Sequence, residues 1–229
     1  MSQSPNPYNT PKTTIDSLYE DKDCAVFYKP AGLLTIPTDK NEEFTLVSIV
    51  NQQRTDAVAL HPAHRLDRDT SGVILFAKGK ENQQILMNAF KEKQVKKTYI
   101  AFVHGHVESS EGKIRIPIKD FYQRKFQKNL PPQSALTLYK VLEYRKDFTI
   151  VEVNPITGRT NQIRIHFTKI GHPLVGEDKY VFRKDFALRF RRTALHAAQL
   201  IFPHPVNQKM ITVKAPLAQD MTNFLEKTI

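Results

Sequence analysis

HRLDRDTSG, residues 64–72, is followed at once by the apolar run VILFA, residues 73–77. Two carboxylates, Asp67 and Asp69, therefore stand just before a segment that is typical of a buried strand. A carboxylate in such a place loses part of its hydration and is held by its neighbours, which is how a reactive side chain is prepared. The alternative is a salt-bridged loop that caps the strand, with TSG as an ordinary turn. These residues alone do not separate the two interpretations.

Further short strands and helices are predicted on both sides of this segment. Strands outnumber helices and several neighbours are joined by short turns, so we predict an α+β fold with a mixed, mainly antiparallel sheet flanked by helices. Residues 1–15 are polar and Pro-rich and are predicted to be a flexible arm, and residues 16–229 a single domain. Strands are expected at 24–28, 73–77, 98–104, 113–118, 136–144, 148–154, 195–202 and 210–214, and helices at 44–50, 82–93, 160–170 and 221–227.

The composition narrows the class of protein. The 229 residues carry a formal net charge of +11, which attracts polyanions, so RNA or DNA is the expected partner. No apolar run reaches the roughly 20 residues needed to cross a bilayer, so we expect no membrane contact and a cytoplasmic location. The single cysteine, Cys24, excludes an internal disulfide, and the histidines show no metal-ligand spacing. Neither a phosphate-binding glycine loop nor a serine-nucleophile motif is present, which argues against kinases and serine hydrolases.

A second segment with chemical potential is TGRTNQIRIH, residues 157–166. Thr160 or Asn161 is placed to cap a helix, and Arg164 follows one turn later beside apolar positions. An arginine turned toward a core needs a carboxylate partner, and Asp67 is the candidate. Alternatively, Arg164 extends to solvent and only its stem is covered.

Two weaker signals involve aromatic residues. Tyr99 begins a predicted strand. A tyrosine in such a place usually packs its ring and leaves its hydroxyl in water. Tyr99 becomes a candidate functional residue only if it faces a pocket together with Asp67. Basic residues also alternate with aromatic ones, a mixture that neutralises phosphates and stacks on unpaired bases. The alternative for the second group is an amphipathic helix over residues 184–192 with a solvated basic face. The two groups are Arg124, Lys125, Phe126 and Lys128, and Tyr180, Phe182, Arg183, Lys184, Phe186, Arg189, Phe190, Arg191 and Arg192.

Taken in order, these segments resemble the RluA-like family of RNA pseudouridine synthases over residues 18–218. Asn161 departs from the family, which commonly has His there; we expect this to alter the helix start or a phosphate contact rather than to abolish catalysis. Many relatives carry an N-terminal S4 RNA-binding domain, which we do not expect here. The matching motifs are KPAGL (29–33), HRLD (64–67) with TSG (70–72), KTYIA (97–101), residues 157–166, GHPLVG (171–176), and LHA (195–197) through HP (204–205).

The resemblance implies a pseudouridine synthase fold with a central catalytic cleft. It implies that Asp67 is the nucleophile or base in a reaction that detaches uracil from C1′ of ribose and reattaches it through C5. A carboxylate suits this reaction because it stabilises or traps a sugar centre with oxocarbenium character. Arg164 would hold Asp67 ionised and aimed, and Tyr99 would pack on the uracil and help to remove the C5 proton. No cofactor and no metal are implied, because the reaction is an isomerisation.

The resemblance also implies substrate-binding residues. Leu195 would form an apolar wall against the base, Arg65 would fill the space that the flipped uridine leaves, and His64 and Lys29 would bind substrate. The expected partner is ribosomal or transfer RNA, bound by a monomer. Two other functions remain open: an RNA-binding protein without catalysis, and hydrolysis of a glycosidic bond in nucleic acid, which would release free uracil.

Overall fold

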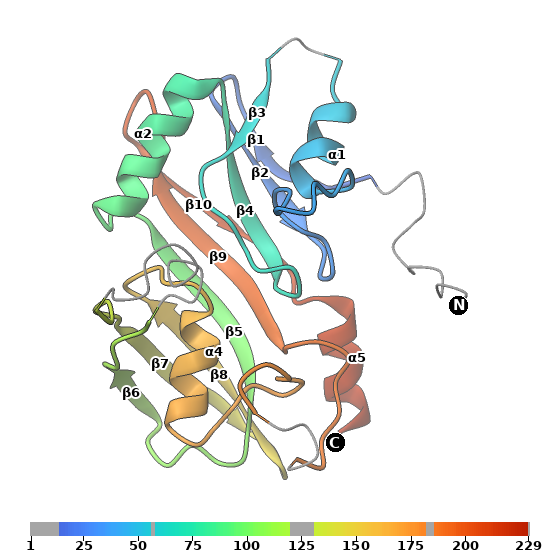
Figure 1. Cartoon of the computed structure of the whole chain (residues 1–229), viewed down its shortest axis with the longest axis vertical. Helices are drawn as coiled ribbons and strands as arrows, with labels where there is room; N and C mark the ends of the chain where they lie inside the picture. Colours follow the sequence, from blue (N-terminus) through green and yellow to red (C-terminus); the bar gives the residue numbers. More distant parts are fainter. Residues whose placement is uncertain (1–13, 56–57, 120–130, 182–185, 229) are drawn as a thin grey trace.

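A computed structural model describes residues 14–55, 58–119, 131–181 and 186–228. They form one sheet of ten strands with helices packed against it (Figure 1). None of the helices within these ranges has the length and apolar character needed to cross a membrane. The strands are β1 (Ser17–Glu20), β2 (Cys24–Lys29), β3 (Leu60–Pro62), β4 (Ser71–Lys78), β5 (Lys96–His104), β6 (Glu111–Ile114), β7 (Thr137–Tyr144), β8 (Phe148–Pro155), β9 (Leu195–Pro203) and β10 (Met210–Lys214), and the helices are α1 (Leu46–Gln52), α2 (Lys80–Lys91), α4 (Gln162–Lys169) and α5 (Gln219–Lys227).

A parallel strand pair, β4 with β9, joins two otherwise antiparallel parts of the sheet, whose order is β1-β2-β4-β9-β5-β8-β7-β6. Gly72 pairs with Ala197 at this junction and has a φ of 112°. A Cβ at this glycine would lie 2.1 Å from the Ala197 carbonyl oxygen, so only glycine allows the two strands to approach. The predicted mixed, mainly antiparallel sheet flanked by helices is confirmed.

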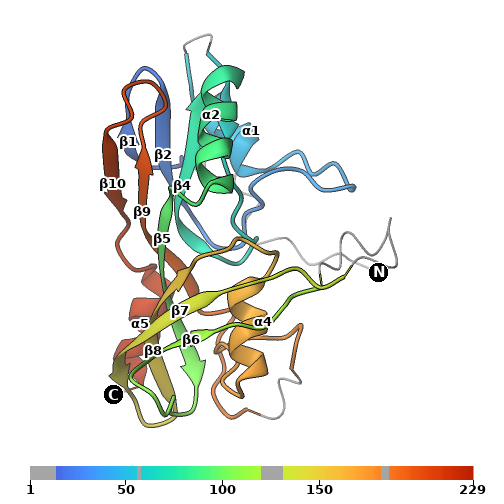
Figure 2. The same ribbon diagram turned by 90° about the vertical axis from the view of Figure 1, so that its left-hand side faces the viewer.

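Helices α4 and α5 pack on opposite faces of β5 and β8, as Figure 2 shows. Side chains alternate along β5, so Ala101 and Val103 join the apolar cluster that contains Phe167 of α4. Phe102 points to the other side and joins the cluster that contains Met221 of α5. The same alternation divides β4, because Val73, Leu75 and Ala77 belong to the α2 cluster, and Ile74 and Phe76 belong to the α1 cluster. Burial on both faces explains why this strand is an unbroken apolar run.

Arg192 anchors α5 to the centre of the sheet. Its guanidinium donates two hydrogen bonds to the Asp220 carboxylate, at 2.7 and 2.8 Å. It also donates to the carbonyl oxygens of Asp69 and Leu195 and to the Ser71 hydroxyl. The side chain is only 7% exposed, so the prediction that places Arg192 on a solvated basic surface is wrong. Its charge is paired with that of Asp220.

The structure corrects two further predictions. Residues 186–192 are irregular rather than helical, and residues 182–185 lie outside the described part of the chain. Ile15, which the sequence assigns to the flexible arm, is buried, and its N–H donates to Gln53 Oε1 at 3.0 Å. The rest of that arm up to residue 13, and the basic group at 124–128, are also outside the described residues. The short strands β1 and β3 were not predicted, because three or four residues carry too little periodicity.

Candidate active site

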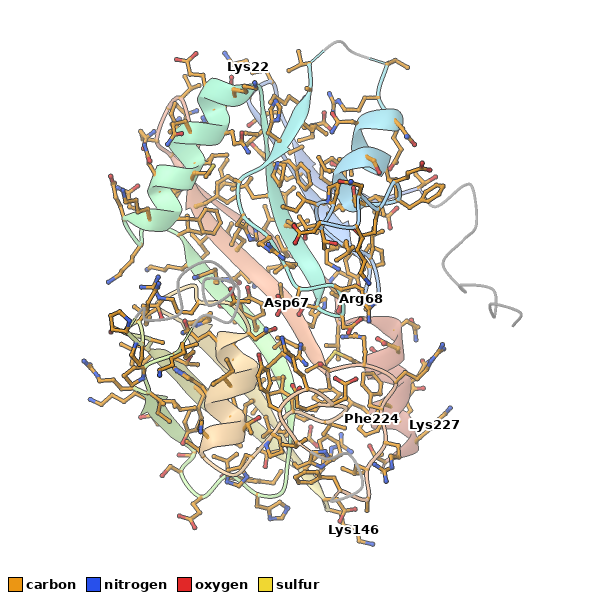
Figure 3. All side chains as sticks on the ribbon, viewed as in Figure 1. Lys22, Asp67, Arg68, Lys146, Phe224 and Lys227 are labelled. Atoms are coloured by element: carbon orange, nitrogen blue, oxygen red, sulfur yellow. The ribbon has the colours of Figure 1, made fainter. Side chains whose placement is uncertain are left out.

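A cavity of about 530 Å³ opens where the β4 side of the molecule meets the α4 side, and Asp67 lies at this junction (Figure 3). Four separate segments supply the predicted catalytic and apolar groups: the loop before β4, the start of β5, the first turn of α4 and the start of β9. Its walls are formed by His64, Arg65, Leu66, Asp67, Thr70, Phe90, Lys91, Lys93, Lys97, Tyr99, residues 155–164 and Leu195.

The loop that carries Asp67 is held from both sides. Leu66 is buried, its N–H donates to Thr35 Oγ1 at 3.2 Å, and its carbonyl accepts from the same hydroxyl at 2.9 Å. Directly after it, the Thr70 N–H donates to the Asp67 carbonyl at 3.1 Å and closes a turn. Asp67 therefore sits on a rigid loop, which suits a reacting group that must keep its direction.

Burial raises the pKa of Asp67 above that of an ordinary aspartate, because removal from water disfavours the charged form. Arg164, Arg65 and Lys29 oppose this effect by electrostatic attraction. Arg164 lowers the pKa of Asp67, as the resemblance implied, but desolvation outweighs the cations and the net shift is upward. The cations oppose the protonation that burial favours, in a site that leaves the carboxylate poorly hydrated and therefore reactive.

A pH dependence follows from the raised pKa of Asp67. The ionised form is required for attack or proton removal, so kcat/KM should fall on the acid side, with a midpoint above the value of about 3.9 for a free aspartate. The measurement is a pH–rate profile on RNA, with RNA affinity determined at each pH as the control. A rate that stays flat down to about pH 4, with affinity unchanged, would contradict this environment for Asp67.

Arg164 has a different partner from the predicted one. Its Nε and Nη2 atoms each lie 2.7 Å from a carboxylate oxygen of Glu177, a bidentate pair in which the Glu177 side chain is fully buried. Asn161 Oδ1 accepts a hydrogen bond from Arg164 Nη1 at 3.3 Å, and the Tyr180 ring lies 5.5 Å from the guanidinium. The predicted ion pair with Asp67 is therefore wrong as a direct contact. Arg164 acts on Asp67 through space, across the cavity that both residues line.

Asn161 occupies the residue position before α4 but does not cap it with its side chain, contrary to prediction. Its φ is 53°, a left-handed conformation that Asn tolerates better than most residues. The side chain is turned to Arg164 instead of the helix N–H groups. The residue that departs from the family pattern thus contacts the guanidinium that faces Asp67.

Tyr99 and Leu195 meet the cavity from neighbouring strands. The register between β5 and β9 shifts between Thr98 and Tyr99, and both Tyr99 and Leu195 line the cavity. Burial, and then the negative charge of Asp67, raise the pKa of Tyr99, so its hydroxyl keeps its proton. The condition that the sequence set for Tyr99, a shared pocket with Asp67, is met.

His64 and Arg65 also line the cavity, in different states. Burial lowers the pKa of His64 to about 3, so its ring is neutral. The Leu75 N–H of β4 donates to His64 Nε2 at 3.1 Å, and the ring packs against Phe90 of α2 at a tilt of 33°, with 4.6 Å between centroids. His64 therefore offers the cavity an apolar ring face, while Arg65 is exposed.

Lys29 does not line the cavity, and the prediction that it binds substrate is corrected. Its side chain is fully buried, and its Nζ donates to the carbonyl oxygens of Pro30, Leu33 and Arg68 at 2.9, 2.6 and 2.9 Å. Burial lowers its pKa to about 7. Lys29 joins the turn after β2 to the loop that follows Asp67, so its role is to position that loop.

We expect Lys29→Met to destabilise the protein by about 3 kcal/mol, because it leaves buried carbonyl oxygens without a donor. This corresponds to a fall in Tm of about 6–12 °C for a chain of this size, measurable by thermal unfolding. Lys22→Met is the matched control, since Lys22 is exposed and far from Asp67 (Figure 3). Equal Tm values for the two variants would contradict the positioning role.

Two buried polar side chains of α4, Gln162 and His166, have roles that the sequence did not predict. Gln162 Oε1 accepts from Thr157 Oγ1 at 2.7 Å and from the Arg159 N–H at 3.0 Å, which closes the loop that forms one wall of the cavity. His166 lies within 2.9 Å of Thr137 Oγ1 and of the Ile116 carbonyl. Gln162 and His166 are four residues apart and therefore lie on the same face of α4. Two polar residues on the inward face of a predicted helix indicate buried hydrogen bonds, and this pattern could have identified them from the sequence.

One cluster of metal-ligating side chains lies away from the cavity: Asp21, Cys24 and His204 bring their ligand atoms within 4.8 Å of one another. The N–H groups of Val206 and Asn207 donate to His204 Nδ1, at 3.1 and 3.2 Å. With that nitrogen accepting, the proton of a neutral ring is on Nε2, which lies 3.1 Å from Asp21 Oδ2. These contacts favour a hydrogen bond that joins the turn between β1 and β2 to the turn after β9, over a metal ligand.

Comparison with known sequences identifies close relatives. The RNA pseudouridylate synthase family profile matches residues 23–169. The dual-specificity RNA pseudouridine synthase RluA of Pasteurella multocida is 39% identical over 215 residues, covering 91% of this chain and 97% of that protein. RluA of Vibrio cholerae is 37% identical over 214 residues, covering 91% of this chain and 86% of the relative.

Comparison with solved structures agrees at the level of fold. Human RNA pseudouridylate synthase domain containing 4 superposes with a TM-score of 0.75 at 23% identity, covering 93% of this chain and 92% of that one. The family match covers the loop of Asp67, Tyr99 and the first turns of α4, and the full-length relatives extend it over β9. The chain therefore belongs to the RNA pseudouridylate synthase family and is an isomerase that converts uridine in RNA to pseudouridine.

Proposed function

We propose that this enzyme modifies uridines in ribosomal and transfer RNA, with Asp67 as its catalytic carboxylate. The observation that carries the proposal is the position of Asp67: a poorly hydrated carboxylate in a cavity that also presents Tyr99, Leu195 and Arg164. The similar RluA proteins are named as dual-specificity synthases, and ribosomal large subunit synthases are also among the relatives. These names supply the two RNA classes to test.

In the proposed reaction the bond between N1 of uracil and C1′ of ribose breaks, and a bond between C5 and C1′ forms. Asp67 either attacks C1′ or removes the C2′ proton. The detached uracil turns while it is held against Leu195 and the Tyr99 ring. The proton leaves C5 and N1 gains one, so the product is an isomer and no net proton, electron or cofactor is required. Arg164 opposes the charge on Asp67 from across the cavity.

The target uridine must leave its stack to reach Asp67, which costs a few kcal/mol. Six lysine and arginine side chains line the described part of the cavity, against a single acidic one. Their attraction for phosphates offsets this energy, and the exposed Arg65 is placed to occupy the space that the base leaves.

The test is a map of pseudouridines in ribosomal and transfer RNA from cells with and without the gene, repeated after adding the purified enzyme. Sites that disappear with the gene and return with the enzyme identify the substrate. If no pseudouridine site is lost from either RNA class, the proposed substrates are wrong. If free uracil is released, the reaction is hydrolysis rather than isomerisation. A monomeric state and a cytoplasmic location stay predictions of the sequence.

A further inference from the structure

The turn that ends α2 contains a lysine in an unfavourable backbone conformation. The Lys93 N–H donates to the Phe90 carbonyl at 3.2 Å, and the Gln94 N–H to the Ala89 carbonyl at 2.9 Å, the pattern of a Schellman helix end. In this pattern the residue at the place of Lys93 is usually glycine, because its φ is positive. Lys93 has a φ of 61°. The fold alone favours glycine here, so the lysine side chain calls for another explanation.

The side chain of Lys93 lines the active-site cavity, and so does that of Lys91. Both residues are exposed. Phe90, in the same turn, packs its ring against His64, and this contact joins the turn to the loop of Asp67. The position of the two lysines at the cavity is therefore built into the fold.

In the described part of the cavity wall, three of the other four cations already have partners, and the fourth, the exposed Arg65, lies on the loop of Asp67. Arg164 is paired with Glu177, Lys97 Nζ donates to the Thr157 carbonyl at 3.4 Å, and Arg159 Nε donates to the Ser134 carbonyl at 3.3 Å. Within the described ranges no hydrogen bond or ion pair engages the ammonium group of Lys91 or Lys93. Charge at a helix C-terminus accounts for Lys91 in the last turn, but it does not require a lysine in the left-handed position that follows.

We infer that Lys91 and Lys93 bind backbone phosphates of the RNA strand that carries the target uridine, at the edge of the cavity where α2 ends. The inference rests on the proposed function. Flexible ammonium groups without protein partners suit phosphates as point charges, and carry no base preference. The two lysines thus position the RNA strand where it enters the cavity. The backbone at Lys93 is strained, and this strain is the cost of placing its side chain there.

The test measures affinity for a fluorescein-labelled RNA hairpin with an all-uridine loop, over a series of salt concentrations. Lys93→Gln should weaken binding about four- to fivefold at about 0.15 M salt, and lower the slope of log K against log salt by about 0.7–0.9, the amount for one lost phosphate contact. Lys146→Gln is the control with the same loss of charge, since Lys146 lies at the end of the molecule far from Asp67 (Figure 3). Equal effects of the two variants would overturn the inference.

Lys93→Gly separates the phosphate contact from the fold. Glycine relieves the strain, so Tm should stay equal or rise by about 2 °C, while affinity falls as in Lys93→Gln. A fall in Tm would show that the lysine side chain supports the fold, and would overturn the argument from strain. The outcome is independent of the proposed substrates, because binding to the hairpin is measured whether or not its uridines are converted. The kinetic readout, where conversion occurs, is a KM that rises more than kcat falls.

Discussion

Asp67→Asn should reduce pseudouridine formation by more than about 10³-fold, because asparagine can neither attack C1′ nor take a proton. The side chain keeps its size, and it no longer brings a charge into a poorly hydrated site. Since burial raises the pKa of Asp67, its ionisation opposes folding as the pH rises above the value for a free aspartate. The variant should therefore keep or exceed the Tm of the natural protein at pH 7 while losing activity.

The measurements are conversion of uridine in RNA under single-turnover conditions, and thermal unfolding. Asp69→Asn is the matched control: it removes a carboxylate two residues away, which does not line the cavity and pairs with the exposed Arg68 at 3.3 Å. We expect that control to stay within about threefold of the natural rate, in line with an exposed ion pair of little energetic weight. Activity in Asp67→Asn comparable to that of Asp69→Asn would remove Asp67 from the mechanism.

The sequence predicted most of the sheet because its central strands have strong local signals. VILFA is apolar on every residue, and such a run is typical of a strand buried on both faces, as β4 is. The shared pocket of Asp67 and Tyr99, which the structure shows, was only a condition in the residue-level reasoning, and the family resemblance alone implied it. Strand boundaries and short strands were harder to predict from the sequence. β1 and β3 are too short to show a hydrophobic period of their own, and they form by pairing with β2 and β4.

The partners of the charged residues were not predictable in the same way. Lys29 was expected to bind substrate and Arg192 to belong to a basic surface, but carbonyl oxygens surround Lys29 in the fold, and Asp220 and carbonyl oxygens surround Arg192. The sequence correctly predicted that Arg164 pairs with a carboxylate, but it chose Asp67 where the structure has Glu177. Glu177, which stands directly after the GHPLVG motif, was not predicted as a partner from the sequence. The path of the chain after α4 places Glu177, rather than Asp67, against the Arg164 guanidinium, and the sequence alone does not give that path.

Replacement of Arg164 by Met should lower kcat by about 10²-fold, because the cavity loses the cation that acts on Asp67 across it. The guanidinium lowers the pKa of Asp67, so its removal should also move the acid limb of the pH–rate profile to higher pH. The single variant leaves the fully buried Glu177 side chain without its partner, which destabilises a protein by about 3–5 kcal/mol. A loss of activity in this variant alone would therefore not distinguish catalysis from folding.

The double variant Arg164→Met with Glu177→Gln makes that distinction, since it removes both charges of the buried pair together. Its Tm should recover most of the difference between Arg164→Met and the natural protein, because no unpaired charge remains. Its kcat should stay about 10²-fold low, and its acid limb should stay at the higher pH, because Asp67 still lacks the guanidinium. Glu177→Gln alone retains the cation, so its acid limb should not move upward. If the double variant regained the natural rate along with its stability, Arg164 would serve the fold alone, and the charge balance of Asp67 would fall to Arg65 and Lys29.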